Sequence, residues 1–451
     1  MDKGPSIFPR SPAMWLSAVL FLAGIVFLGF VPGQSDFGWI LAGYIPAFVA
    51  YALMLRQSDR APLPFLLGLA VLARLILFFS FPNLSDDVYR FIWDGRLLIQ
   101  GYNPFDHLPA YYMEAGQEVP GLTAALFREL NSPEYFTIYP PVAQATFALA
   151  CWLFPTSIIG SALVMKLFLL ACELGTLWLL PRLLRTFGLP AGRALIYALN
   201  PLVVVEIMGN LHYEGAMIFF LLLGIYWLQK DRIYAAAVAI ALSIAAKLLP
   251  LLFLPFLIRR LGWPKSFRFF AVLGGTLLLL FAPLLSGVFL ENFGNSLDLY
   301  FRKFEFNASV YYVLRWLGYL QKGYNQIAQI GPMLALGTFI GITAMAFRNR
   351  SSDWRSFPPL ALFAISLYLF FTTTVHPWYV AMPVALCLFT NWRFPVVWSG
   401  LILLTYINYS YPEYRENLWI VALEYSLVFA FLIWEFLKRR APSTTGKEPK
   451  S

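Results

Sequence analysis

The segment NLSDDVYRFIWDGRLLIQGYNPF, residues 83–105, follows directly on an apolar run and brings several charged side chains together. If residues 88–100 are helical, Asp87, Arg90 and Asp94 are three or four positions apart and share one face. This spacing predicts a helix lying on a membrane surface, with an acid–base cluster on one side. An ordinary amphipathic surface helix with structural ion pairs has the same pattern.

The composition indicates a membrane protein. The chain has 451 residues, of which 59% are hydrophobic and only 13% are charged. A soluble globular chain carries about 25% charged residues. We therefore predict an all-α, polytopic membrane protein with about 12–14 transmembrane helices. Four runs carry almost no charge: Trp15–Val31, Leu67–Phe81, Phe270–Leu285 and Leu336–Phe347.

The formal net charge of +9 arises from short basic connectors between the apolar runs. Cytoplasmic loops of membrane proteins are enriched in Lys and Arg, and this accounts for the charge without a nucleic-acid partner. We expect these connectors to be cytoplasmic and the loop 82–140 to lie outside. The connectors contain Lys3 and Arg10, Arg56 and Arg60, Arg182–Arg193, Lys230–Arg232, Arg259–Arg268, Arg348–Arg355, Arg393, and Lys438–Arg440.

This topology is consistent only if the apolar stretch Pro141–Phe154 does not cross the membrane. The stretch is short for a crossing, and we expect it to re-enter or to lie at the outer interface. The best acid–base candidates then share the outer side with all three histidines. These residues are Asp86, Asp87, Asp94, His107, His212, Glu214 and His376.

The domain organisation is expected to be simple. Residues 1–440 are expected to form one integral-membrane domain with the loop 82–140 as its outer catalytic loop, and residues 441–451 a disordered cytoplasmic tail. The first apolar run ends without a small-residue cleavage site and should remain as a span. The three cysteines lie in apolar runs without a CxxC pair, which is typical of small core residues: Cys151, Cys172 and Cys387.

Three later stretches carry candidate functional residues. In NPLVVVEIMGNLHYEG, Glu206 lies within a span, while His212 and Glu214 lie at its outer mouth; a structural carboxylate beside a helix cap is the plainer interpretation. Lys247 is a lone cation near a span end, where it either snorkels to the interface or holds a phosphate. In VHPWY, His376 and Tyr379 are either interfacial belt residues or ligands of a phosphate oxygen.

Several motifs are absent. There is no HExxH, no GxxxxGK[ST] and no GxGxxG, which argues against a zinc protease, a P-loop ATPase and a dinucleotide enzyme. No residues are assigned to a metal.

The chain resembles the GT-C superfamily of membrane glycosyltransferases at SDDVYRFIWDGR followed by GYNPF. More narrowly, it is similar to bacterial relatives of the polyprenyl-phosphate-mannose mannosyltransferases. The similarity includes the NPLVVVEIMGNLHYEG stretch, AAKLLPLLFLP and VHPWY, and it runs from Arg74 to Tyr379. Glu214 stands where that group usually has Asp.

The resemblance implies a multi-pass enzyme of the cell envelope, in the bacterial inner membrane, with its active site on the outer face. It would transfer a hexose such as mannose from a polyprenyl-phosphate donor to a glycan or lipid acceptor by an inverting mechanism. A carboxylate of the first outer loop, Asp87 or Asp86, would be the base. A divalent cation is possible, and the partners are lipids and glycans rather than nucleic acid.

The residues divide into groups by these expected roles. Asp87 shares its helix face with Arg90 and Asp94, which would position it, whereas Asp86 is better placed to cap the helix. The leaving phosphate needs cations, for which Arg90, Arg96, Lys247 and His376 are available. Supporting or substrate-binding roles fall to Asp94, Tyr89, Trp93, His212, Glu214 and Tyr379.

A rival interpretation is a multi-span transporter or a flippase for lipid-linked sugars, with Glu206, Lys247 and Asp87 lining the pathway. The single long loop with its DDxxR cluster and the lack of an internal repeat argue against it. Nothing in the residues favours a non-catalytic assembly partner.

Overall fold

A computed structural model describes residues 8, 9, 11–413 and 415–440. The described residues form an all-helical protein without strands; one isolated bridge joins Phe306 to Thr374. The predicted fold class is therefore confirmed. The expected cytoplasmic markers Lys3 and Arg10 and the tail 441–451 lie outside the described residues.

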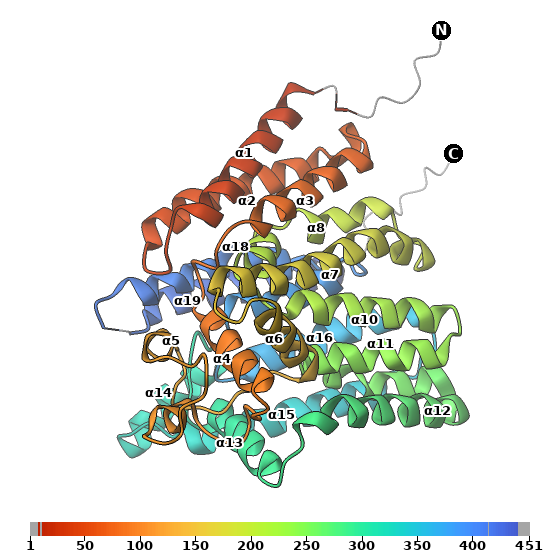
Figure 1. The fold of residues 1–451 in the computed structure, drawn as a ribbon. Helices are drawn as coiled ribbons and strands as arrows, with labels where there is room; N and C mark the ends of the chain where they lie inside the picture. Colours follow the sequence, from red (N-terminus) through yellow and green to blue (C-terminus); the bar gives the residue numbers. More distant parts are fainter. Residues whose placement is uncertain (1–7, 10, 414, 441–451) are drawn as a thin grey trace, which may run out of the picture.

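The helices follow one another along the whole chain (Figure 1). The α-helices are α1 (Pro12–Phe30), α2 (Phe37–Arg56), α3 (Leu63–Phe78), α4 (Asp87–Ile99), α5 (Ala124–Arg128), α6 (Pro141–Leu153), α7 (Ile158–Thr186), α8 (Leu195–Ala198), α9 (Pro201–Val203), α10 (Glu214–Gln229), α11 (Ile233–Ala246), α12 (Pro255–Phe281), α13 (Phe289–Arg302), α14 (Val310–Lys322), α15 (Ile327–Arg348), α16 (Phe357–Phe371), α17 (Ala381–Cys387), α18 (Phe394–Leu401) and α19 (Leu418–Arg440).

Short helical turns of other kinds lie between them. The 3-10 turns are η1 (Ser58–Arg60), η2 (Pro109–Met113), η3 (Ala191–Ala194), η5 (Leu249–Phe253), η6 (Ala282–Leu284), η7 (Trp354–Ser356), η8 (Pro377–Val380) and η9 (Ile402–Ser410), and η4 (Val204–Gly209) is a π-helical turn.

The described residues contain seven helices that are long and apolar enough to cross a membrane, or eight if the bent pair Ala191–Ala198 and Pro201–Gly209 is one span. Five shorter apolar helices accompany them: α3, α6, α10, α11 and the helix Pro377–Cys387. The predicted total of about 12–14 spans is therefore reached only if the shorter helices also cross. The count by length is smaller because proline and tight turns divide several apolar runs.

One of the seven long helices contains a sharp turn. Gly262 in α12 has φ 69° and ψ 163°, a conformation that favours glycine. Just beyond it, Lys265 Nζ lies 2.6 Å from Asp231 Oδ1, in the turn between α10 and α11. Lys247, at the end of α11, therefore lies at the opposite end of the helices from Gly262. Residues 248–261 carry the chain back along the bundle.

The basic connectors gather at one end of the bundle. Arg260 donates to Ser356, Arg193 donates to Asn391, and the Glu435 carboxylate accepts from the backbone N–H of Arg393. The segment 82–140, together with α13 and α14, lies at the other end (Figure 1). This separation matches the predicted clustering of the connectors, and the side of the membrane on which each end lies stays a prediction.

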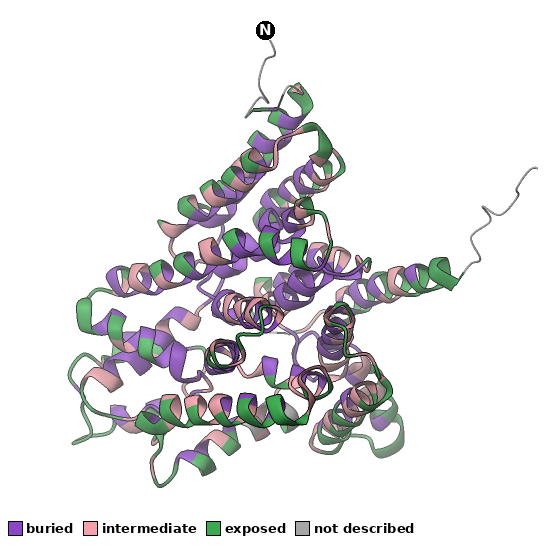
Figure 2. Cartoon of the chain, turned by 90° about the vertical axis from the view of Figure 1, so that its right-hand side faces the viewer, coloured by how far each residue is buried: buried purple, intermediate pink, exposed green. Residues whose placement is uncertain are grey.

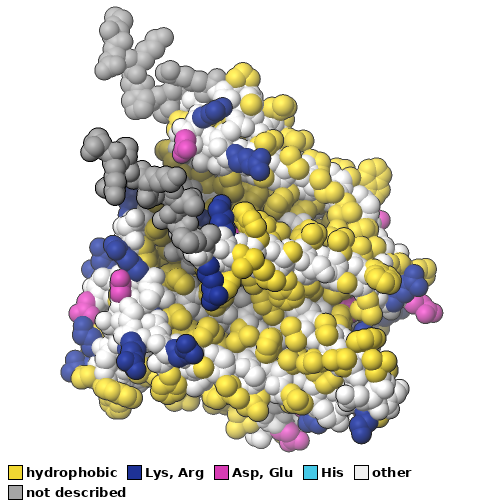
Figure 3. Space-filling model, turned by 180° about the vertical axis from the view of Figure 1, so that it is seen from behind, with side chains coloured by type: hydrophobic (Ala, Val, Ile, Leu, Met, Phe, Trp, Pro, Cys, Tyr) yellow, Lys and Arg dark blue, Asp and Glu magenta, His cyan; other side chains and the backbone are white. Residues whose placement is uncertain are grey.

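The surface is suited to lipid. Buried residues concentrate where helices face one another, and exposed residues cover the outer faces (Figure 2). Seen from behind, hydrophobic side chains cover most of the molecule, and most Lys and Arg lie towards the left edge (Figure 3). Exposed apolar side chains such as Trp263, Leu279 and Phe339 would be costly in water and are favourable in a bilayer.

Helix α4 is buried among other helices instead of lying on the surface, contrary to the sequence-based expectation. It packs against α6, and a Cβ added at Gly95 would come within 2.5 Å of the Phe147 carbonyl oxygen. Only glycine allows the two backbones to approach so closely. Helix α6 in turn packs on α7. At 13 residues it is about 20 Å long, which is less than a hydrocarbon core of about 30 Å. That α6 does not cross the membrane stays a prediction.

Buried charges tie α3 to its neighbours. Arg74 is fully buried, and its Nε lies 2.7 Å from Glu173 Oε2 on α7. Glu173 also accepts a hydrogen bond from Tyr197, and Arg74 donates to the Ala198 carbonyl. Lys166, also on α7, donates to the Leu77 and Ser80 carbonyls, which lie at and just beyond the end of α3. These contacts fix the point at which the segment 82–140 begins.

The topology can be tested by cysteine labelling, because all three native cysteines are buried. Gln117 is exposed in the segment 82–140, and Lys230 is exposed at the opposite end. A membrane-impermeant maleimide should label Gln117→Cys on intact cells, and Lys230→Cys only after permeabilisation. Labelling of Gln117→Cys from the cytoplasmic side alone would contradict the topology.

The ion pair between Arg74 and Glu173 predicts an asymmetric response to mutation. Arg74→Leu leaves Glu173 buried without its cation and should lower the free energy of unfolding by about 3–5 kcal/mol. The double variant Arg74→Leu/Glu173→Leu should recover much of this loss, because no charge remains buried. Unfolding measured in mixed micelles would show this. A double variant no more stable than Arg74→Leu would count against the ion pair as the cause.

Candidate active site

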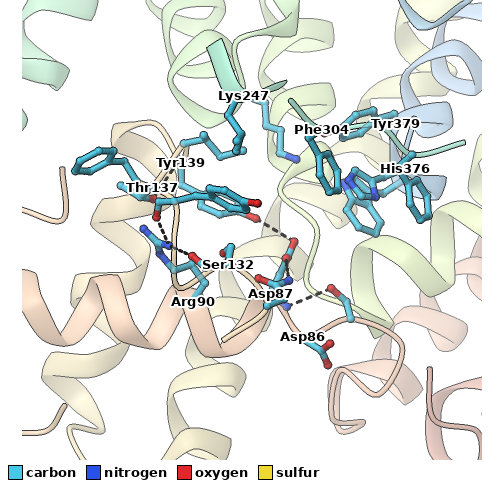
Figure 4. Close-up of a pocket in the computed structure, with 18 of the residues that line it drawn as sticks. Asp86, Asp87, Arg90, Ser132, Thr137, Tyr139, Lys247, Phe304, His376 and Tyr379 are labelled. Atoms are coloured by element: carbon cyan, nitrogen blue, oxygen red, sulfur yellow. Dashed lines mark hydrogen bonds between the residues drawn. The ribbon is translucent and has the colours of Figure 1, made fainter. Parts of the chain in front are cut away.

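A cavity of about 290 Å³ lies where the segment 82–140 meets the ends of α11 and η8. Segments far apart in the sequence line it, and Figure 4 shows their side chains converging on the cavity. The lining residues are Gln34, Ser85, Asp86, Asp87, Arg90, Asn131, Ser132, Tyr135, Phe136, Thr137, Ile138, Tyr139, Lys247, Leu299, Phe304, Phe306, His376, Trp378, Tyr379 and Tyr409.

Asp87 is the first residue of α4 and points into this cavity (Figure 4). Asn131 Nδ2 donates to Oδ1 and the Tyr139 hydroxyl donates to Oδ2, each at 2.9 Å. Burial alone would raise the pKa of Asp87. The neighbouring His212 and Lys247 side chains, together with the two hydrogen bonds, outweigh burial and bring the pKa of Asp87 below its ordinary value. Asp87 is therefore a carboxylate at neutral pH.

Asp86 differs from its neighbour in role and environment. It occupies the position before α4, but its side chain does not cap the helix, contrary to the sequence-based expectation. Its backbone there has φ −87° and ψ −1°, not the extended conformation typical of a capping residue. Burial, followed by the charges of Asp87 and Glu129, raises the pKa of Asp86. The two carboxyls thus have pKa values shifted in opposite directions.

Arg90 holds the segment 132–135 in place and is not a free cation. Its Nε lies 2.9 Å from Asp94 Oδ1, and its Nη1 donates to the carbonyls of Ser132 and Tyr135. Asp94 also accepts from Gln144 on α6. The expectation that Arg90 and Asp94 hold Asp87 directly is therefore wrong. They hold the segment 132–135, which is continuous with Asn131.

Three other candidates on α4 do not line the cavity. Arg96 donates to the carbonyls of Gly121 and Thr156, and burial lowers its pKa. Trp93 is fully buried against Phe127. Tyr89 is half-buried. In this structure, all three support the fold of the segment 82–140.

Lys247 ends α11 and projects into the cavity from the side opposite α4 (Figure 4). Its Nζ lies 2.7 Å from Glu214 Oε1 and faces the rings of Tyr139 and Tyr379 at 6.0 and 5.4 Å. Glu214 is fully buried at the start of α10. Glu214 thus positions the ammonium group and does not itself line the cavity.

His376 lines the cavity as expected, but not as a cation. Its ring stacks on Trp378 with centroids 4.5 Å apart and also faces Phe306. Burial is the main cause that lowers the pKa of His376, to about 3. The imidazole is therefore neutral at physiological pH and offers a phosphate oxygen an N–H donor without a charge.

His212 lies beneath Asp87. Its Nδ1 is 3.9 Å from Asp87 Oδ2, and its Nε2 is 3.3 Å from Glu206 Oε2. Its ring stacks on Trp378 with centroids 3.6 Å apart. The preceding residue, Leu211, has φ 66°, which is unusual for a residue other than glycine.

Several site residues escaped sequence-based reasoning. Asn131 and Tyr139 bind Asp87 from 44 and 52 residues away. Trp378 belongs to the VHPWY stretch, but its place between the two histidine rings could not be predicted from the sequence. The IYPP stretch ending the long loop was the only signal for Tyr139. Nothing in the sequence distinguishes Asn131. Among the described residues, no group of three or more His, Cys, Asp or Glu side chains could hold a metal ion.

The arrangement places a hydrogen-bonded carboxylate and an ammonium group on opposite sides of one cavity lined by aromatic rings. A carboxylate held in this way can accept a proton from an attacking hydroxyl group. An ammonium group held by a buried carboxylate can bind an anionic group. The rings give flat apolar surfaces on which a sugar can lie.

Comparison with known proteins agrees with this chemistry. Residues 18–261, slightly more than half of the chain, match the family model described as "Alpha-(1->6)-mannopyranosyltransferase, N-terminal domain". The chain is 28% identical over 346 residues to alpha-(1->6)-mannopyranosyltransferase A of Mycobacterium tuberculosis, covering 70% of this chain and 62% of that protein. It is 25% identical over 192 residues to the protein of the same name from Corynebacterium glutamicum, covering 40% of this chain and 36% of that protein.

The matched regions thus span less than two thirds of the length of either relative. The family model nevertheless covers α4 with Asp87, the His212 and Glu206 stretch, and Lys247. The resemblance noted from the sequence motifs is confirmed: this multi-pass chain belongs to the alpha-(1->6)-mannopyranosyltransferase family.

Proposed function

We propose that the protein transfers a mannosyl residue from a polyprenyl-phosphate donor to a hydroxyl group of a glycan or lipid acceptor at the outer face of the membrane. Asp87 is the general base, and the reaction inverts the configuration of the anomeric carbon. Family membership supports the sugar and the class of reaction. The names of both relatives specify an alpha-(1->6) linkage. By inversion, such a product would arise from a beta-linked donor.

The position of Asp87 is the observation that carries this proposal. Its carboxylate projects into the cavity, is ionised at neutral pH and is held by two hydrogen bonds from the segment 82–140. A general base must be fixed and must carry no proton before the reaction. Asp86 makes no comparable hydrogen bonds, and its raised pKa makes it less suited to remain ionised.

Lys247 is the cation best suited to the leaving phosphate. Arg90 is occupied by Asp94 and two carbonyls, Arg96 lies outside the cavity, and His376 is neutral. Lys247 lies across the cavity from Asp87, and its ammonium group has further donor capacity beyond Glu214. A phosphate there would neutralise its charge, while His376 donates a neutral hydrogen bond.

The membrane setting fits a lipid donor. Exposed apolar side chains cover much of the helical surface, so a polyprenyl chain could lie along it while its phosphate reaches the cavity. The transporter interpretation has no comparable support, because the family to which the chain belongs is named for glycosyl transfer.

The assignment of the base predicts a sharp difference between two adjacent residues. Asp87→Asn should lower the rate of single-turnover mannosyl transfer by a factor of at least about 100, the effect of losing a general base. Asp86→Asn should change the rate by only a few-fold, because Asp86 neither caps α4 nor binds Asn131 or Tyr139. Thermal unfolding of both purified variants would control for folding.

The opposite result, an inactive Asp86→Asn and an active Asp87→Asn, would assign the base to Asp86. Activity in both variants would argue against an acid–base site at the start of α4 altogether.

The ion pair between Lys247 and Glu214 allows donor binding to be separated from folding. Lys247→Met removes the phosphate cation and should weaken donor binding by about 10–100-fold, the loss of one charge-assisted hydrogen bond. It also leaves Glu214 buried and unpaired, so the variant should be less stable. Lys247→Met/Glu214→Gln should regain stability without regaining donor affinity.

Binding can be measured with a polyprenyl-phosphate analogue, and stability by thermal unfolding. Wild-type affinity in the double variant would exclude Lys247 as the phosphate ligand.

A further inference from the structure

A chain of three ionisable side chains extends from the cavity into the protein. Asp87 lines the cavity, His212 lies behind it, and Glu206 lies behind His212, fully buried. The mechanism above uses only the first of them. His212 and Glu206 do not line the cavity themselves. Burying an imidazole beside a carboxylate is costly in an apolar interior, so the pair calls for an explanation.

The backbone around this pair departs from regular structure. Glu206 lies in the π-helical turn η4, and such turns concentrate at functional sites. Leu211, directly before His212, has φ 66°. Local strain of this kind persists when the surrounding structure requires a particular side-chain position. Here it places the imidazole between two carboxylates.

The surroundings hold both side chains in place. Tyr406 donates to Glu206 Oε1 and Asn210 donates to Oε2, so both carboxylate oxygens have partners. Trp378 stacks on the His212 ring and keeps its edge directed at Glu206 on one side and Asp87 on the other. The titratable groups around the pair are Asp87 from α4 with its partner Tyr139, Tyr44 from α2, Tyr406 from η9, His376 beyond Trp378, and Lys247 across the cavity.

We infer that His212 and Glu206 form a proton relay that receives the proton taken up by Asp87. This inference rests on the proposed function. Glu206 Oε2 lies 3.3 Å from Nε2 without hydrogen-bond geometry, but its negative charge favours an N–H at that nitrogen, which leaves the lone pair on Nδ1 facing Asp87. The 3.9 Å between Nδ1 and Asp87 Oδ2 is too long for a hydrogen bond, as expected when no proton lies between them.

The proton and electron balance is complete within these groups. The acceptor oxygen bonds to the anomeric carbon as the bond from that carbon to the phosphate oxygen breaks, and the phosphate leaves with the electron pair. The hydroxyl proton passes to Asp87, which then donates it to Nδ1 of His212. Asp87 regains its charge, and the resulting imidazolium is stabilised by the Glu206 carboxylate. After the product leaves, the proton returns by way of Asp87 to solvent, because His212 is buried behind Asp87.

The relay gives the proton on Asp87 a place to go. A general base must be unprotonated before each turnover, and Asp87 holds the acceptor's proton once the sugar has been transferred. An imidazole is ordinarily more basic than a carboxylate by roughly 2.5 pKa units. Passing the proton to His212 therefore makes the overall transfer more favourable and frees the base for the next turnover. His212 acts through Asp87 and does not touch the substrate.

The test uses single-turnover mannosyl transfer by the purified full-length protein in mixtures of H₂O and D₂O. The wild type should show a linear dependence of rate on deuterium fraction, because a single proton moves in each step. His212→Gln, which keeps an amide near Glu206, should lower the rate about tenfold or more. The acid limb of its pH–rate profile should shift to lower pH, while donor affinity stays unchanged.

A matched control is His107→Gln, the same substitution in the segment 82–140, where the imidazole stacks on Tyr111 away from the cavity. It should keep the wild-type rate, isotope dependence and pH profile. If His212→Gln does not fold, Glu206→Gln tests the same relay and should shift the pH profile in the same direction.

A curved dependence in the wild type, or a wild-type rate and pH profile in His212→Gln, would overturn the relay while leaving Asp87 as the base. Absence of mannosyl transfer by the wild type would overturn the proposed function and the relay with it.

Discussion

The ion pair between Arg90 and Asp94 determines the shape of the site. Arg90 also donates from Nη1 to the carbonyls of Ser132 and Tyr135, so a pair within one helix also fixes a segment more than 40 residues away. That segment is continuous with Asn131, which binds Asp87. In an apolar interior, an unpaired charge or carbonyl is costly, so these contacts persist together. The long loop therefore has one defined position over α4.

The same physical constraint divides the charged residues into two groups. Arg74, Arg90 and Lys166 have all been drawn into structural contacts, which leaves them little capacity for a ligand. Lys247 keeps its ammonium group at the cavity, because its partner Glu214 approaches from the buried side only. Burial also removes the charge from His376. Most of the cations that the sequence offered as phosphate ligands are therefore not available to a substrate.

The fold class and the importance of α4 follow from the sequence because they depend on local pattern. Long apolar runs must form helices in lipid, and the spacing of Asp87, Arg90 and Asp94 is visible directly. The contacts of Asp87 could not be predicted in the same way. Asn131 and Tyr139 reach it only through the path of a loop with little regular structure. The neutral state of His376 likewise depends on aromatic rings from other segments, and the missing cap at Asp86 on its backbone angles.

The turn at Gly262 is a point at which the chain could be divided into two fragments. The family match ends at residue 261, and nothing lies within 4 Å of a Cβ added at the half-buried Gly262. Residues 263–265, directly after it, are exposed, and exposed turns tolerate a break in the backbone. A break there would divide the span Pro255–Leu284 and would leave Asp87, His212 and Lys247 on one fragment and His376 and Trp378 on the other. Neither half alone encloses the cavity, so the active site is a property of their assembly within the bilayer.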